Sequence, residues 1–76
     1  VRNNDLRLWP SPASDVLFVA HRTERVLSME LLDLRGRPLL VAGAVDHLDL
    51  SLLAAGMYVV RVTTPAATYV RSVVKR

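Results

Sequence analysis

The sequence has no cysteine, and it has only three glycines and four aromatic residues in 76 positions. Without cysteine the chain forms no disulfide and offers no thiolate ligand to a metal. No apolar run approaches the roughly 18 residues that cross a bilayer, and no charged segment followed by an apolar one opens the sequence. We therefore expect neither a transmembrane segment nor a signal peptide in it. The separated glycines also exclude a glycine-rich phosphate loop.

Residues suited to catalysis or metal binding are few. His21 and His47 are the only histidines, and neither has a ligand-type spacing. Asp46, His47 and Asp49 are close in sequence, but the alternation of a strand places His47 and Asp49 on one face and Asp46 on the other. A three-ligand site would therefore need a bend, and no serine stands in a nucleophile elbow. We expect no enzyme activity, no metal and no cofactor.

The charge of the chain is unevenly distributed. Residues 1–49 hold six arginines and seven acidic residues, whereas residues 50–76 hold four basic residues and no acidic one. Such a basic end could meet phosphate, an acidic surface or an anionic glycolipid. It could equally reflect the outward positions of ordinary strands. With so few aromatic residues to stack on bases, nucleic acid is not an expected partner.

Short segments of alternating hydrophobicity, separated by turn residues, predict an all-β fold. The expected strands are a short edge strand through Leu6, Leu8 and Trp9, then Val16–Ala20, Val26–Leu34, Leu39–Ala42, Val45–Leu50, Met57–Thr63 and Thr68–Val74. In the third of these, Leu27, Met29 and Leu31 should share one face. We predict a small, Ig-like antiparallel β-sandwich of about seven short strands, of Greek-key type. It spans residues 9–76, and residues 1–8 are a linker or the start of the first strand.

The segment Asp49–Val62 is expected to form a tight corner that feeds a strand. Its apolar anchors would be Leu50, Leu52 and Leu53. Ser51 could cap a single helical turn, and Gly56 could take the positive φ that reverses the chain. Tyr58 would then place its ring in the core and return its hydroxyl to nearby backbone, as tyrosines do at the corners of Greek-key sandwiches.

A second turn is expected at Asp33–Arg37. The Asp33 side chain can accept a hydrogen bond from the backbone two residues later. Gly36 suits the left-handed position of a bulged hairpin, and Pro38 is tolerable as the first residue of the returning strand. The sequence therefore predicts a β-hairpin here.

Four segments, taken in order, resemble a single family: Pro10–Asp15, Asp33–Arg37, Leu50–Val62 and Tyr69–Arg76. They are similar to the Pro-Asn-Pro-Ala opening, the Asp-Leu-x-Gly-(Lys/Arg) hairpin, the Leu-x-x-Gly-x-Tyr strand entry and the basic, valine-containing last strand of the C-terminal sorting domains of type IX secretion, or Por secretion tails. The similarity covers about Trp9 to Arg76. Ser11 replaces the usual asparagine, and arginine replaces most of the usual lysines near the end.

The resemblance implies a C-terminal signal that directs a larger passenger across the bacterial outer membrane. The passenger would cross the periplasm and reach the cell surface or the medium. A sortase would cleave the tail ahead of the first strand, near Val1 to Asp5, and the passenger would be released or joined to anionic lipopolysaccharide. Residues implied in recognition by the translocon or sortase are Gly36, Gly56, Tyr58, Arg71, Lys75 and Arg76. The glycines and the tyrosine would shape the recognised surface, and the basic residues would present a charged end.

The physical pattern alone leaves a second interpretation open, because a fold does not determine a function. An Ig- or fibronectin-like accessory module could bind carbohydrate or pack against a neighbouring catalytic domain. A sorting tail is removed from the mature protein, whereas an accessory module is retained.

Overall fold

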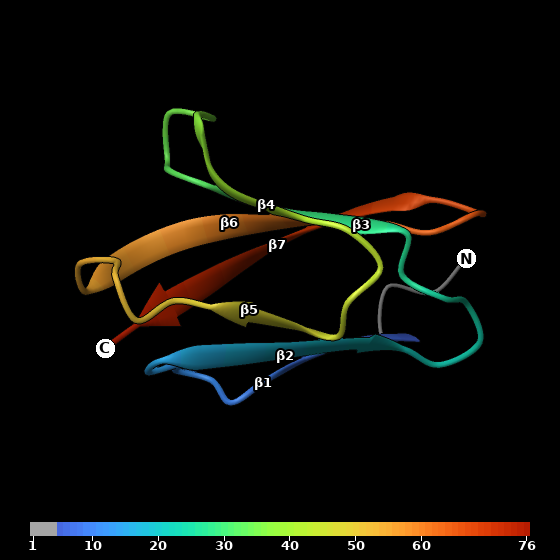
Figure 1. Cartoon of the computed structure of the whole chain (residues 1–76), viewed down its shortest axis with the longest axis horizontal. Helices are drawn as coiled ribbons and strands as arrows, with labels where there is room; N and C mark the ends of the chain where they lie inside the picture. Colours follow the sequence, from blue (N-terminus) through green and yellow to red (C-terminus); the bar gives the residue numbers. More distant parts are fainter. Residues whose placement is uncertain (1–4) are drawn as a thin grey trace.

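In the part of the chain that the structure describes, seven strands form two antiparallel sheets that pack face to face (Figure 1). The structure is a computed structural model, and it describes residues 5–76. One sheet has the order β1-β2-β5, made of β1 (Leu6–Trp9), β2 (Val16–His21) and β5 (His47–Asp49). The other has the order β4-β3-β6-β7, made of β3 (Ser28–Leu32), β4 (Pro38–Ala42), β6 (Gly56–Thr63) and β7 (Thr68–Lys75). The predicted β-sandwich is confirmed. Residues 5–76 contain no helix that is long and apolar enough to cross a membrane.

The core lies between the sheets and is filled by every second residue of the strands. Its fully buried members include Leu17 and Val19 of β2, Met29 and Leu31 of β3, Leu50, and Val60 and Val62 of β6. Alternation follows from the two-residue period of a strand. Burying each such side chain contributes roughly 1.5–3 kcal/mol, and these contributions hold the two sheets together.

Two strands are shorter than the sequence pattern predicts. The third strand begins at Ser28 rather than Val26, and Leu27 is partly exposed instead of sharing the buried face of Met29. The Leu27 N–H still bonds to the Thr63 carbonyl at 2.8 Å, so the chain enters the sheet here without regular alternation. β5 contains only three residues because the Val45 N–H turns back to the Gly43 carbonyl at 2.9 Å.

The corner before β6 differs from the prediction in two respects. Leu52 is 97% exposed, whereas Leu50 is buried as expected. Ser51 caps no helix; its N–H donates to Asp49 Oδ1 at 2.9 Å, and the Leu53 N–H donates to the Leu50 carbonyl at 3.0 Å. The chain reverses within these few residues, so consecutive leucines point in different directions and cannot all enter the core.

The loop between β1 and β2 lies against the end of β7. Ala13, in the proline-containing turn, donates its N–H to the Val74 carbonyl at 2.9 Å and accepts the Arg76 N–H at 2.8 Å. It forms an isolated parallel bridge with Lys75, and its side chain is buried. One residue of the first sheet's loop therefore extends the second sheet beyond β7. We call this contact the Ala13 clip.

Candidate recognition surface

The strands β6 and β7 form a hairpin whose register is unbroken from Thr63 opposite Thr68 to Gly56 opposite Lys75. This ladder places the corner that precedes β6 beside the end of β7. Gly56 and Tyr58 thus lie next to Lys75 and Val73. The hairpin brings together predicted site residues that are about 20 positions apart in the sequence.

The tyrosine of the corner has the predicted arrangement. The Tyr58 hydroxyl donates to the Ala54 carbonyl at 2.5 Å, and the half-buried ring packs against the core. Gly56 has a φ of +156°, a backbone angle that side-chain-bearing residues rarely adopt. The hydroxyl bond closes the corner on itself, and this fixes the direction in which β6 leaves it.

The basic residues of β7 do not all face solvent. Arg71 and Lys75 share a strand face with Tyr69 and Val73, and that face points into the sandwich. Lys75 is only 8% exposed, and its Nζ donates to the Arg76 carbonyl oxygen at 3.1 Å. Lys75 is therefore not an outward strand position, and most of its side chain is covered.

Arg71 lies along the edge of β7. Its guanidinium stands 5.9 Å from the centre of the Tyr69 ring, and it donates to the Val70 carbonyl at 3.1 Å. A guanidinium over an aromatic face is attracted to the ring. Arg76 is exposed. The positive charge that this end displays therefore comes from Arg76 and from the partly exposed Arg71.

Gly36 lies in the β3–β4 hairpin, which projects from the second sheet at the end where the C-terminus lies (Figure 1). Its φ is +87°, as the predicted bulged turn requires. The Asp33 carboxylate accepts the N–H groups of Arg35 and Arg37, each at 2.9 Å, and the Arg37 Nε at 2.8 Å. The backbone bond from Arg37 is the largest of the effects that lower the pKa of Asp33. Gly36 lies between β3 and β4, so it belongs to a different hairpin from the predicted site residues of β6 and β7.

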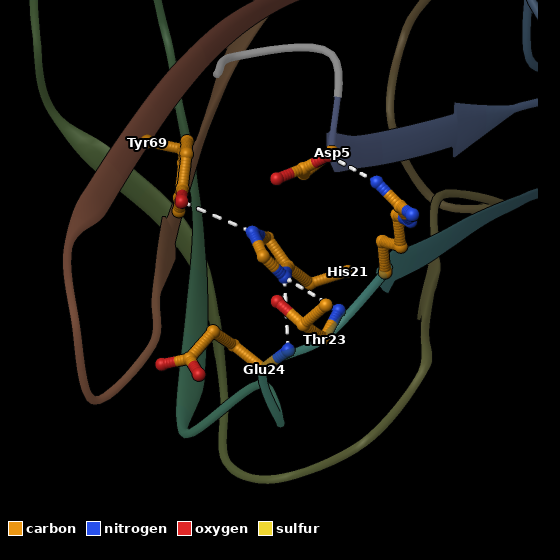
Figure 2. Close-up of polar contacts among 6 residues, drawn as sticks. Asp5, His21, Thr23, Glu24 and Tyr69 are labelled. Carbon is orange, nitrogen blue, oxygen red and sulfur yellow. Dashed lines mark hydrogen bonds and ion pairs between the residues drawn. The ribbon is translucent and has the colours of Figure 1, made fainter. Parts of the chain in front are cut away.

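A histidine that the sequence placed in a polar turn instead connects the two sheets. His21, the last residue of β2, lies 3.0 Å through Nε2 from the hydroxyl of Tyr69, which is buried at the start of β7 (Figure 2). Its Nδ1 accepts the N–H groups of Thr23 and Glu24 at 3.2 and 2.9 Å. Because Nδ1 is an acceptor, the neutral ring carries its proton on Nε2 and donates to Tyr69. No local motif predicts this contact, since its partners are 48 residues apart.

The aspartates near His47 serve local bonds. His47 Nδ1 lies 2.9 Å from Asp46 Oδ1, and this bond lowers the pKa of Asp46. Hydrogen bonds with Ser51 lower the pKa of Asp49. The two carboxylates thus stabilise a strand end and a turn. On the outer face of the same sheet, Trp9 stacks on Phe18 with ring centres 5.7 Å apart.

The edge of β7 suits binding through its backbone groups and through the positive charge at its end. β7 is an edge strand, joined by the Ala13 clip at one end and by His21 at the other. A protein-family model described as "Secretion system C-terminal sorting domain" matches residues 7–76. No curated protein matches the chain. The match spans nearly the whole sequence, so the chain belongs to this family and is a C-terminal sorting signal of type IX secretion, whose members direct a passenger to the cell surface or the extracellular space.

Proposed function

We propose that the chain is a non-catalytic address, which the translocon or sortase complex of type IX secretion reads at β7 and at the adjacent β6. The observation that supports this proposal is the state of β7. It is a regular edge strand of eight residues, it ends beside the exposed Arg76, and contacts from the other sheet hold both of its ends. An edge strand of this kind offers backbone hydrogen bonds to a partner.

The later steps of the proposal concern the passenger. The passenger passes through the periplasm with its tail folded, crosses the outer membrane, and loses the tail to a sortase. It is then released or joined to anionic lipopolysaccharide. The expected cleavage region, Val1 to Asp5, lies mostly outside the described residues, which begin at Asp5. A cut ahead of β1 would leave the sandwich intact.

A secretion assay tests the address. A fluorescent passenger with an N-terminal export signal is fused to residues 1–76 and expressed in a host with type IX secretion. Its controls are the same passenger without the tail and a fusion carrying Leu31→Asp, which places a charge in the core. We expect only the intact fusion to reach the surface or medium, shortened by the mass of the tail. The same periplasmic location for all three proteins would contradict the proposal.

A charge exchange tests which edge of the four-stranded sheet is read. Arg76→Glu reverses the exposed charge beside β7, and Arg35→Glu makes the same change in the β3–β4 hairpin. We expect Arg76→Glu to reduce export more strongly, with both tails remaining folded. Equal effects would show that net charge matters and that its position does not.

Carbohydrate binding by an accessory module is the second candidate. It is favoured by the stacked Trp9 and Phe18 rings, which are 46% and 38% exposed on the outer face of the first sheet. Exposed aromatic surface commonly marks an interaction site. Retention of the purified chain on insoluble polysaccharides, lost in Trp9→Ala, would support this role. A tail that is retained in the mature protein would also favour it over the address.

A further inference from the structure

A groove of about 270 Å³ separates the edge strand of one sheet from the edge strand of the other. β1 forms one wall and β7 the other, and both are outer strands of their sheets. Leu6, Leu8 and Val73 are among the apolar residues that line it. Within residues 5–76 the sandwich is therefore open along this side, where no described strand lies between the two sheets.

The backbone of β7 faces this opening. The Val74 carbonyl bonds to Ala13, which lies on the side of β7 away from β6. Every second residue of an antiparallel strand directs its N–H and C=O to the same side. Val70 and Ser72 must therefore also direct their backbone groups away from β6. Among the backbone hydrogen bonds of residues 5–76, none uses the outward N–H of Val70 or either outward group of Ser72.

The Ala13 clip is the beginning of a further strand. At Ala13 the chain forms a parallel bridge with Lys75 of β7, and the Ala13 side chain is buried among core residues. The chain then leaves the edge, and the positions beside Val70 and Ser72 receive no strand from residues 5–76. A strand from elsewhere could continue the ladder, and its inward side chains would contact Leu8.

The charge of the groove favours one kind of strand. Arg71 is the single charged residue among those that line the groove within residues 5–76, and no acidic residue lines it. Its guanidinium lies beside the outer edge of β7, where it donates a hydrogen bond to the Val70 carbonyl. An incoming carboxylate would meet a positive charge beside the ladder, whereas an incoming ammonium would be repelled.

We propose that a component of the type IX machinery adds an extended strand to β7 within this groove, with apolar side chains and one acidic side chain on the face that enters the groove. This inference rests on the proposed address function and specifies how the address is read. The apolar side chains of the added strand pack on Leu6, Leu8 and Val73. Its backbone pairs with the Val70 N–H and with both outward groups of Ser72, and its acidic side chain lies near Arg71, on the same face as the apolar ones. The mode is β-strand addition at a sheet edge.

Binding of a defined peptide to the 76-residue chain tests the mode. The probe is a short, soluble peptide with valine, glutamate and valine at successive positions of one strand face and threonine on the other face, and its control is the same peptide with lysine in place of the glutamate. We expect the glutamate peptide to bind at least about tenfold more tightly, and to protect the Val70 and Ser72 amides from hydrogen exchange. Protection confined to β4 or to β1, equal binding of both peptides, or no binding would overturn the inference.

A matched pair of variants removes the backbone donor alone. Ser72→Pro deletes the outward N–H, which an edge strand tolerates, while Ser72→Ala keeps it and removes only the hydroxyl. We expect Ser72→Pro to lose peptide binding and Ser72→Ala to retain it, with thermal midpoints within a few degrees of each other. If Ser72→Pro unfolds, amide protection in the original chain still decides the question. Occupation of the edge by a second copy, seen as a dimer in sedimentation, would overturn the inference.

The same variants in the secretion assay separate the two proposals. Retention of the Ser72→Pro fusion in the periplasm, with export of Ser72→Ala, supports strand addition. Export of both fusions, while the tailless passenger stays inside, refutes strand addition and leaves the address function standing. Equal behaviour of the tailed and tailless passengers refutes the address function itself.

Discussion

The two edges of the four-stranded sheet are built differently. β4 has five residues, begins with Pro38, and pairs with β3 across a register shift between Leu31 and Leu32. β7 has eight residues in one continuous register. Proline and irregular pairing make an edge unsuitable for another strand, whereas a long regular edge invites one. The sheet is therefore protected at β4 and left ready for pairing at β7.

The contacts that hold the two edges differ in the same way. β7 is tied to the other sheet through Tyr69 at its start and through Val74 and Arg76 at its end. β4 follows a hairpin turn that is stabilised by Asp33 within the turn, and Val41 on the outer face of β4 is 72% exposed. Changes near β7 should thus affect the whole domain, and changes near β4 should remain local. The following four predictions test that difference, from the largest effect to the smallest.

Ala13→Asp should cause the largest loss. It places a charge at a buried position and disrupts the clip on β7, at a cost of about 3 kcal/mol in the free energy of unfolding. Urea denaturation measures the loss. Val41→Asp on the exposed face of β4 is the control, with an expected change of about 0.5 kcal/mol or less. Similar losses for both variants would remove the distinction between the edges.

His21→Ala should lower the free energy of unfolding by about 2 kcal/mol. The buried Tyr69 hydroxyl loses the donor that His21 supplies, and two backbone N–H groups lose their acceptor. Tyr69→Phe removes the same inter-sheet bond and keeps the ring, so it should cost about 1 kcal/mol. A double-mutant cycle isolates the bond between them. Strictly additive losses would mean that this bond does not couple the sheets.

Gly36→Ala should cost about 1 kcal/mol, because alanine is strained in the left-handed region that Gly36 occupies at φ +87°. Neither Gly36 nor Gly43 has a neighbour within 4 Å of an added Cβ, and Gly43 has no such φ. Gly43→Ala is therefore a control for volume, and we expect it to leave thermal stability nearly unchanged. Export of a Gly36→Ala fusion should persist, since the hairpin joins β3 to β4, and β4 is the edge of the sheet opposite β7.

The smallest expected effect is a change in stability at acidic pH. The pKa of Asp33 in the folded chain lies below the ordinary value of 3.8, since its backbone and side-chain bonds to Arg37 favour the carboxylate. Its contribution to stability is therefore complete above that value and is lost as the pH falls through the lower, folded-state pKa. The stability difference between the original chain and Asp33→Asn should shrink below about pH 4. A constant difference down to the acid limit would contradict this assignment.

The sequence predicts the parts of this fold that depend on local pattern. Alternating residues locate all seven strands, and turn chemistry explains Gly36, Gly56 and the Tyr58 corner. Local pattern does not reveal which residues meet when the sheets close. Lys75 is charged yet buried, and Leu52 is apolar yet exposed.

The groove depends on long-range pairing to an even greater degree. Its walls come from β1 and β7, which are far apart in the chain and meet only in the completed sandwich. Alternation shows which side chains of β7 point inward, but the Ala13 bond to Val74 is needed to know which backbone groups point outward. The recognition residues named from the resemblance remain predictions, and the structure adds Val70 and Ser72 to the positions worth testing.

The Ala13 clip has a consequence for how the protein is made. Ala13 bonds to residues that follow it by about sixty positions, and β7 supplies Tyr69 and Val73 to the core. Contacts of such long sequence separation form late, because a large loop must close first. In a C-terminal domain the final strand is also the last to leave the ribosome. A precursor whose synthesis stops early therefore lacks both β7 and a closed sandwich. Only a passenger that has been synthesised in full carries the folded domain.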